Sequence, residues 1–176
     1  MRNTSKMTTL ENKFPLLAVE HGCIISKDAD ITVAFEVELP ELYTVTGAEY
    51  EAIHGCWCKA IKVLPDYSIV HKQDLQKDDM SFLSRSFERH FNERPYLKHS
   101  CYLYLTKTTK ERNRMQSNFS TLCRGHIIPK ELDKETAGKF MEAAEQFERI
   151  MNDSGFVRLR RLSTDEIVGT EGKAGL

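Results

Sequence analysis

The segment from residue 31 to residue 39 constrains the fold most, because large apolar side chains alternate there with smaller or polar ones. A period of two residues is typical of a β-strand with one buried face. Such a strand requires a sheet and a second layer packed against its apolar face. The alternating positions are Ile31, Val33, Phe35, Val37 and Leu39, and Pro40 ends the segment.

Three segments predict helices that could form this second layer. Thr46 and Glu49 form a capping box, and a stripe of Tyr50, Ile53, Trp57, Ile61 and Leu64 follows at helical spacing. Trp57 is expected to be a buried anchor against the sheet. Residues 79–92 and 132–151 repeat apolar side chains in the same way, and Gly155 suits the left-handed position after the last helix. Further strands are expected at residues 14–20, 23–26, 67–71, 101–105 and 156–162, with a turn at His21-Gly22 and a long loop with some helix at 106–124.

These elements predict an α+β (or α/β) fold, in which a mixed β-sheet of about six strands is covered by three main helices. Residues 1–162 are expected to form a single domain. Ser163 and Glu166 form another capping box, but Gly169, Gly172 and Gly175 weaken the helix that it starts. We therefore expect residues 163–176 to contact the body little and to begin a linker to a further domain.

The charge balance gives no reason to expect a strongly charged partner, because the chain has 25 basic and 26 acidic residues. No apolar run is long enough for a signal peptide or a membrane span. The five cysteines are an odd set without repeated spacing, which is typical of reduced thiols in a cytoplasmic protein.

The segment Gly169-Thr170-Glu171-Gly172-Lys173 resembles part of a phosphate-binding loop. Such a loop has a first glycine five positions before the second and a hydroxyl residue after the lysine. Ile167 and Ala174 occupy these two positions, so a linker is the better interpretation and no nucleotide site is expected.

A possible metal site lies at residues 54–58, where His54, Cys56 and Cys58 are close in sequence. On a helix the two cysteines point in nearly opposite directions, so one zinc ion could hardly bind both. Core packing is the better interpretation. Nor does any local signature mark a nucleophile with its base: His90 beside Glu93, or His126 after Arg124-Gly125, are pairs that any polar surface offers. No catalytic, cofactor-binding or metal-binding residue is predicted.

Two basic segments, residues 107–114 and 158–161, could contact phosphate groups. The near-neutral total charge instead favours a solvated surface on which these side chains meet nearby acids. Direct DNA binding is therefore the second hypothesis.

Four segments resemble the start of TraG-type conjugative-transposon ATPases, which are similar to the VirB-class traffic ATPases of type IV secretion systems. They are Asn12–Leu17, Asp79–Leu83, Phe87–Leu97 and Tyr104–Lys107. One departure is that Leu75-Gln76-Lys77 joins the strand ending near Gln73-Asp74 to the helix expected at Asp79 almost directly. Family members have a longer segment at this junction.

The resemblance implies a non-catalytic amino-terminal docking and assembly domain at the cytoplasmic face of the inner membrane. Its implied partners are other conjugation-channel proteins, its own carboxy-terminal ATPase domain and, in a homo-oligomer, further copies. ATP and magnesium are expected only in that motor domain, so this chain is not expected to be an enzyme.

Overall fold

The computed structural model describes residues 15–27, 29–40, 45–79, 96–108 and 134–176. Its elements, in chain order, are β1 (Leu16–Glu20), β2 (Cys23–Ser26), β3 (Ile31–Glu38), α2 (Gly47–Val63), β4 (Ser68–Asp79), β5 (Tyr96–Lys107), α4 (Lys134–Asp153), β6 (Arg158–Arg161), α5 (Thr164–Val168), β7 (Gly169–Thr170) and β8 (Lys173–Ala174).

The main sheet has six strands, in which β1-β2-β3-β5-β4 form a continuous order and β6 also pairs with β3. β5 covers one edge of β3 from Ile31 to Val37. The other edge is shared, because β2 pairs with Ile31 to Val33 and β6 pairs with Phe35 to Glu38. Every pairing between described strands is antiparallel, so the fold is α+β with about six strands, as the sequence predicts.

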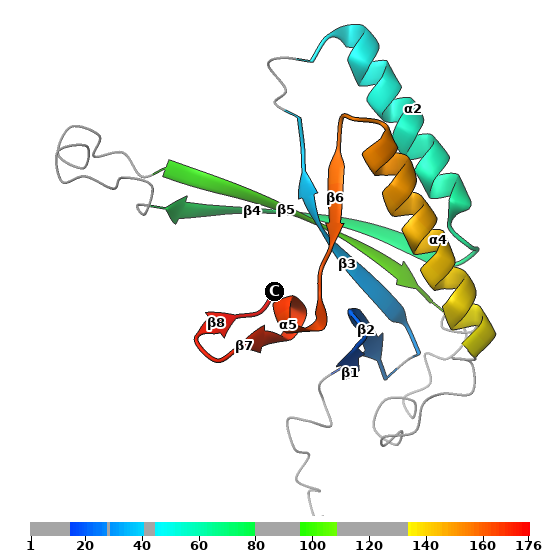
Figure 1. Ribbon diagram of the computed structural model, residues 1–176, viewed down its shortest axis with the longest axis vertical. Coiled ribbons are helices and arrows are strands. Elements are labelled where there is room, and N and C mark those ends of the chain that lie inside the picture. The colour runs from blue at the N-terminus through cyan, green and yellow to red at the C-terminus, as the bar shows by residue number, and fades with distance from the viewer. Residues whose placement is uncertain (1–14, 28, 41–44, 80–95, 109–133) are drawn as a thin grey trace, which may run out of the picture.

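The described elements from β3 to β6 have the order β-α-β-β-α-β, and their strands lie in the order β6-β3-β5-β4. This is the ferredoxin-like, split βαβ topology. The hairpin β1–β2 and the carboxy-terminal unit α5–β7–β8 are additions to it. In Figure 1, α2 and α4 lie side by side on one face of the sheet.

The core lies between this face and α4, whose apolar stripe matches the prediction. Phe140, Ala144, Phe147 and Met151 are buried against alternate residues of β3, β5 and β6. The two capping boxes, at Thr46 and Ser163, are also present. Gly155 has a φ of 73°, the left-handed conformation expected after α4.

Trp57 is only half-buried, so its expected position is partly wrong. Its ring packs edge-to-face against Phe147 of α4, with the ring centroids 6.1 Å apart. The fully buried residue of α2 is Ala60, whereas Ile61 is 48% exposed and Tyr50 63% exposed. The reason is that α2 packs against α4 through the side of the helix that carries Cys56 and Ala60, which turns the predicted stripe partly outward.

The strands β4 and β5 are much longer than predicted and pair along all twelve residues, from Ser68↔Lys107 to Asp79↔Tyr96. The helix expected from Asp79 to Asn92 does not begin at Asp79, because this residue is the last of β4. The remaining residues of the expected helix lie outside the described residues. Leu75-Gln76-Lys77 is therefore strand rather than a junction. β3 covers β5 only from Cys101, so the pairs from Leu75↔Ser100 onward project as a ribbon (Figure 1).

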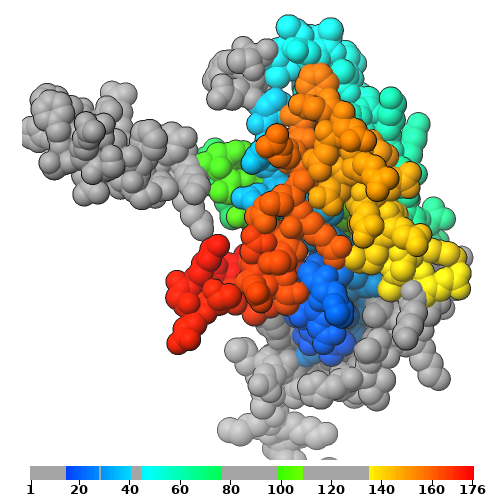
Figure 2. Space-filling view, in the orientation of Figure 1, coloured from blue at the N-terminus to red at the C-terminus, as the bar shows by residue number. Residues whose placement is uncertain are grey.

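The carboxy-terminal unit contacts the body, so the expectation of few contacts is wrong. Ile167 is 8% exposed and forms a small apolar cluster with Ala34 and Leu162. The amide of Gly22 donates a hydrogen bond of 2.8 Å to Thr164 Oγ1, which attaches α5 to the β1–β2 turn. Figure 2 shows this orange-red segment directly beside the blue β1–β2 hairpin. Side chains far apart in the sequence make these contacts, and helix propensity did not reveal them.

Candidate functional site

The candidate site lies on the face of the sheet opposite α2 and α4. Successive strand residues point to opposite faces, so Tyr102 and Tyr104 of β5 point away from the core that contains Leu103. The hydroxyl of Tyr104 donates a hydrogen bond of 2.8 Å to Gln73 Oε1, and its ring meets His71 edge-to-face at 5.8 Å. Burial, and to a smaller extent the neighbouring Tyr102, raises the pKa of Tyr104.

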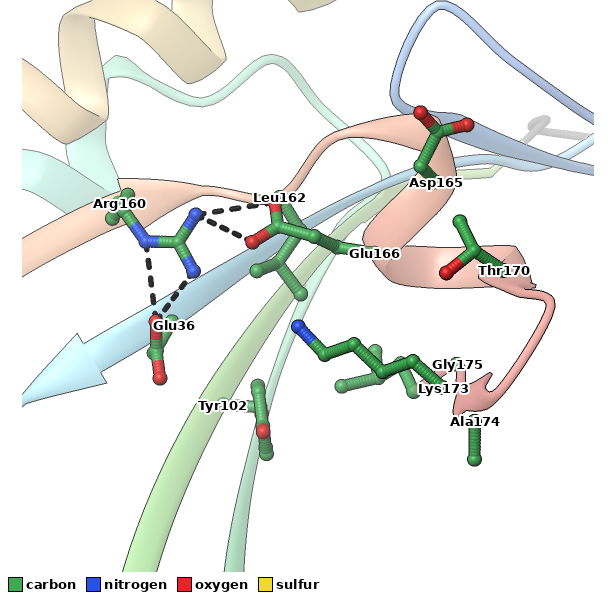
Figure 3. A pocket seen from close by; sticks show the side chains of 11 residues that line it. Glu36, Tyr102, Arg160, Leu162, Asp165, Glu166, Thr170, Lys173, Ala174 and Gly175 are labelled. Carbon is green, nitrogen blue, oxygen red and sulfur yellow. Dashed lines mark hydrogen bonds and ion pairs between the residues drawn. The ribbon is translucent and has the colours of Figure 1, made fainter.

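A cavity of about 290 Å³ opens between this face and the carboxy-terminal unit (Figure 3). The sheet supplies one wall, and the unit α5–β7–β8 supplies the other. Both walls carry polar and apolar groups. The lining residues are Glu36, Tyr102, Arg160, Leu162, Asp165, Glu166, Thr170, Lys173, Ala174, Gly175 and Leu176.

Arg160 connects the two walls of this cavity. Its Nη2 lies 2.6 Å from Glu36 Oε2 on β3, and its Nη1 lies 2.8 Å from Glu166 Oε1 on α5. The backbone amide of Ser163, followed by Arg160, lowers the pKa of Glu166 to about 2. The same two carboxylates raise the pKa of Arg160. The guanidinium is thus held by two carboxylates and is a structural connector.

Lys173 extends into the opening in Figure 3, toward the space between Tyr102 and Leu162. No ion pair joins its ammonium to another residue in the described parts of the chain. Besides the paired Arg160, Glu36 and Glu166, the cavity therefore offers the Lys173 ammonium, the Asp165 carboxylate, the Tyr102 phenol and apolar surface from Leu162 and Leu176. Such a set can bind a polar side chain or a short peptide segment.

The segment that resembles a phosphate loop forms the β7–β8 hairpin, with Gly169 paired to Ala174 and Thr170 paired to Lys173. Gly169 has a φ of 89°, and a Cβ there would lie 2.4 Å from the amide nitrogen of Gly175. These residues therefore fold as a hairpin beside α5, and their role as the start of a linker stays an expectation. A phosphate loop instead connects a strand to a following helix.

The thiols of Cys56 and Cys58 point apart, as the helical spacing predicts. Cys56 Sγ lies 3.4 Å from the carbonyl oxygen of Ile150 on α4, so it belongs to the interface between the helices. Cys58 Sγ is exposed and lies 3.7 Å from His54 Nε2. Among the described residues no three His, Cys, Asp or Glu side chains are grouped as metal ligands.

The basic segment 158–161 lies on β6, and acids face two of its arginines. Arg158 lies 3.5 Å from Glu38, and Arg160 binds Glu36 and Glu166. Arg161 donates to the carbonyl oxygen of His21. These contacts match the expected surface on which basic side chains meet nearby acids.

Only the start of the basic segment 107–114 is described. Lys107 donates to the carbonyl oxygens of Asp66 and Thr108, at 2.7 and 2.9 Å, and lies over the Tyr67 ring. Burial lowers the pKa of Lys107, and Asp66 partly opposes this shift. Residues 109–114, His90, Glu93, Arg124-Gly125 and His126 lie outside the described residues.

Sequence reasoning did not single out Tyr102 and Tyr104, although a signal was present. Cys101, Leu103 and Leu105 alternate with them, and this period of two places both phenols on the face away from the core. Arg160 could not have been assigned to Glu36 in the same way, because the register of β3 and β6 determines that contact.

In the comparison with protein families, residues 3–55 match a family described as "Domain of unknown function, B. Theta Gene description (DUF3875)". In the described part of the chain, this stretch holds β1, β2, β3 and the first half of α2. No curated protein matches the chain. None of the described helices has the length and apolar character needed to cross a membrane.

Proposed function

We propose that this chain is the non-catalytic amino-terminal docking domain of a TraG-type conjugation ATPase. The single observation that carries the proposal is the β4–β5 ribbon, which projects beyond β3 (Figure 1). Four segments of the sequence support the same class by resemblance, and one of them, Tyr104–Lys107, lies on β5.

The ribbon supports docking because it presents backbone groups at a sheet edge. Between residues 96 and 100, β5 pairs with β4 on one side, and no described strand pairs with the other side. An extended segment of another protein can add to such an edge through main-chain hydrogen bonds. We propose that a strand of a conjugation-channel protein at the inner membrane adds here. ATP and magnesium would then act only in the motor domain of the full protein.

Site-specific photocrosslinking in the full-length protein tests this proposal. A photoreactive residue at His99, which is exposed on β5 beside this edge, should crosslink to a conjugation-channel protein in cells carrying the transfer system. The same residue at Glu171, on the exposed β7–β8 turn, is the matched control. Equal crosslinking to a channel protein from both positions would contradict docking through the ribbon. The absence of any crosslink to a channel protein would contradict it as well. Calorimetric titration of the chain with Mg-ATP should show no saturable binding.

Binding of transferred DNA through residues 107–114 and 158–161 is the second proposal. The carboxylates facing Arg158 and Arg160 reduce the positive charge that this part of the surface can offer to phosphates. A DNA titration at several salt concentrations separates the two proposals, since phosphate contacts cause a steep loss of affinity as salt increases.

A further inference from the structure

The outer edge of β4 is one end of the described strand order, and it is separate from the β5 edge assigned to docking. In the described parts of the chain, β4 pairs with β5 alone, over all of its twelve residues. An edge of this length is open to pairing with another strand unless its side chains oppose it. The side chains of β4 therefore indicate which strand it can accept.

Two opposite charges lie at the middle of this edge. The ammonium nitrogen of Lys72 and Oδ2 of Asp74 are 2.5 Å apart on the same side of the strand, and each side chain is about two-fifths exposed. His99 on β5 holds the other carboxylate oxygen at 3.0 Å. Hydrogen bonds from Lys72, and then from Cys101 and His99, lower the pKa of Asp74, so the carboxylate is ionised near neutral pH.

We infer that a second copy of this chain pairs with β4 antiparallel, across a two-fold axis at Gln73. This axis places Lys72 of each copy opposite Asp74 of the other, so each charge has two neighbours of opposite sign. Val70 then lies opposite Gln76, and His71 lies opposite Leu75. Opposite charges directly across two strands stabilise their pairing, and like charges destabilise it.

The charges also select the register. A two-fold axis through a residue pairs odd-numbered residues with odd-numbered ones and even-numbered residues with even-numbered ones. The helix-covered faces of both copies therefore lie on the same side of the joined sheet. Moving the axis by one residue places Lys72 opposite Lys72 or Asp74 opposite Asp74. The axis at Gln73 avoids both repulsions. Because β4 ends the strand order of each sheet, the product is one continuous sheet through two copies, with the two β4 strands at its centre.

Charge reversal tests the interface in the complete 176-residue chain by analytical ultracentrifugation over a range of concentrations. The unmodified chain should form dimers. Lys72→Glu alone and Asp74→Lys alone each place two like-charged pairs across the axis, and each should weaken dimerisation by roughly tenfold or more. Lys59→Glu, at an exposed position of α2, is the control and should leave the dimer unchanged.

Restoration of the dimer gives the sharper test. An equimolar mixture of Lys72→Glu and Asp74→Lys should form a heterodimer, because opposite charges again face each other across the axis. The double variant Lys72→Glu/Asp74→Lys should form a homodimer for the same reason. Circular dichroism melting checks that each variant folds. A monomeric unmodified chain, single variants that dimerise normally, or a mixture that stays monomeric would each overturn the inference. None of these results depends on the docking proposal.

Discussion

Arg160 and Glu36 lie opposite each other on β6 and β3, with Arg160 Nη2 2.6 Å from Glu36 Oε2, although 124 positions separate them in the sequence. The same guanidinium binds Glu166 on α5. One side chain thus joins the central strand of the sheet to the carboxy-terminal unit. Glu166, which the Ser163 amide and Arg160 hold as a carboxylate, makes the stability of that unit dependent on pH.

The pH dependence follows from the lowered pKa of Glu166. Its pKa falls from an ordinary value of 4.5 to about 2 in the folded chain. Its contribution to the free energy of unfolding is therefore complete above about pH 5 and is lost as the pH falls toward 2. The unmodified chain should be more stable than Glu166→Gln at pH 7, and the difference should shrink at pH 3.5 and again at pH 2.5.

Urea unfolding at these pH values measures the difference. Glu171→Gln is the control, because it removes a carboxylate of the same unit that forms no described ion pair. A difference for Glu166→Gln that stays constant down to pH 2.5 would contradict a Glu166 carboxylate held by the Ser163 amide and by Arg160.

Neighbouring residues of α5 test whether the carboxy-terminal unit is part of the folded body. Ile167 is buried against Ala34 and Leu162, whereas Val168 is 61% exposed. Ile167→Ala should lower the free energy of unfolding by about 2–3 kcal/mol. Val168→Ala should change it by less than about 0.5 kcal/mol. Equal small effects in urea unfolding would mean that α5 contributes little to the stability of the domain.

The contact between α2 and α4 predicts unequal costs for two aromatic residues. Phe147 is completely buried, so Phe147→Ala should cost about 3–5 kcal/mol. Trp57 packs on Phe147 but is half-buried, so Trp57→Ala should cost less, about 2–3 kcal/mol. Tyr50→Ala, at an exposed position of the same helix, is the control. A larger loss for Trp57 than for Phe147 would contradict the packing of a half-buried Trp57 against the buried Phe147.

The thiols should differ strongly in reactivity. Burial, and then Asp74 beside it, raises the pKa of Cys101 to about 11, so at pH 8 this group is a protonated and inaccessible thiol. Cys58 is exposed on α2. Iodoacetamide at pH 8, followed by peptide mass spectrometry, should label Cys58 well before Cys101. In urea both should react, and rapid labelling of Cys101 in the folded chain would show that β5 is accessible there.

Local periodicity in the sequence was sufficient for much of the fold. The alternation from Ile31 to Leu39 predicts β3, and the stripe from Ala137 to Met151 predicts α4. Both capping boxes form where Ser or Thr precedes Glu by three residues. These features were predictable because each depends on residues within a few positions of one another, and side-chain direction along a helix or strand follows directly from its period.

The sequence alone therefore determined the α+β class, the helix that covers the sheet and the directions of Cys56 and Cys58. Only the tertiary structure decided the length of the β4–β5 ribbon, the attachment of α5 and the binding of Arg160 to Glu36. Residues 72–79 carry no apolar alternation, and pairing with β5 holds them as a strand. Ile167 has only Val168 as an apolar neighbour, yet strands β1, β2 and β3 bring a buried cluster to it. Each of these features depends on strand register between distant segments, and register is a property of the assembled sheet rather than of any local pattern.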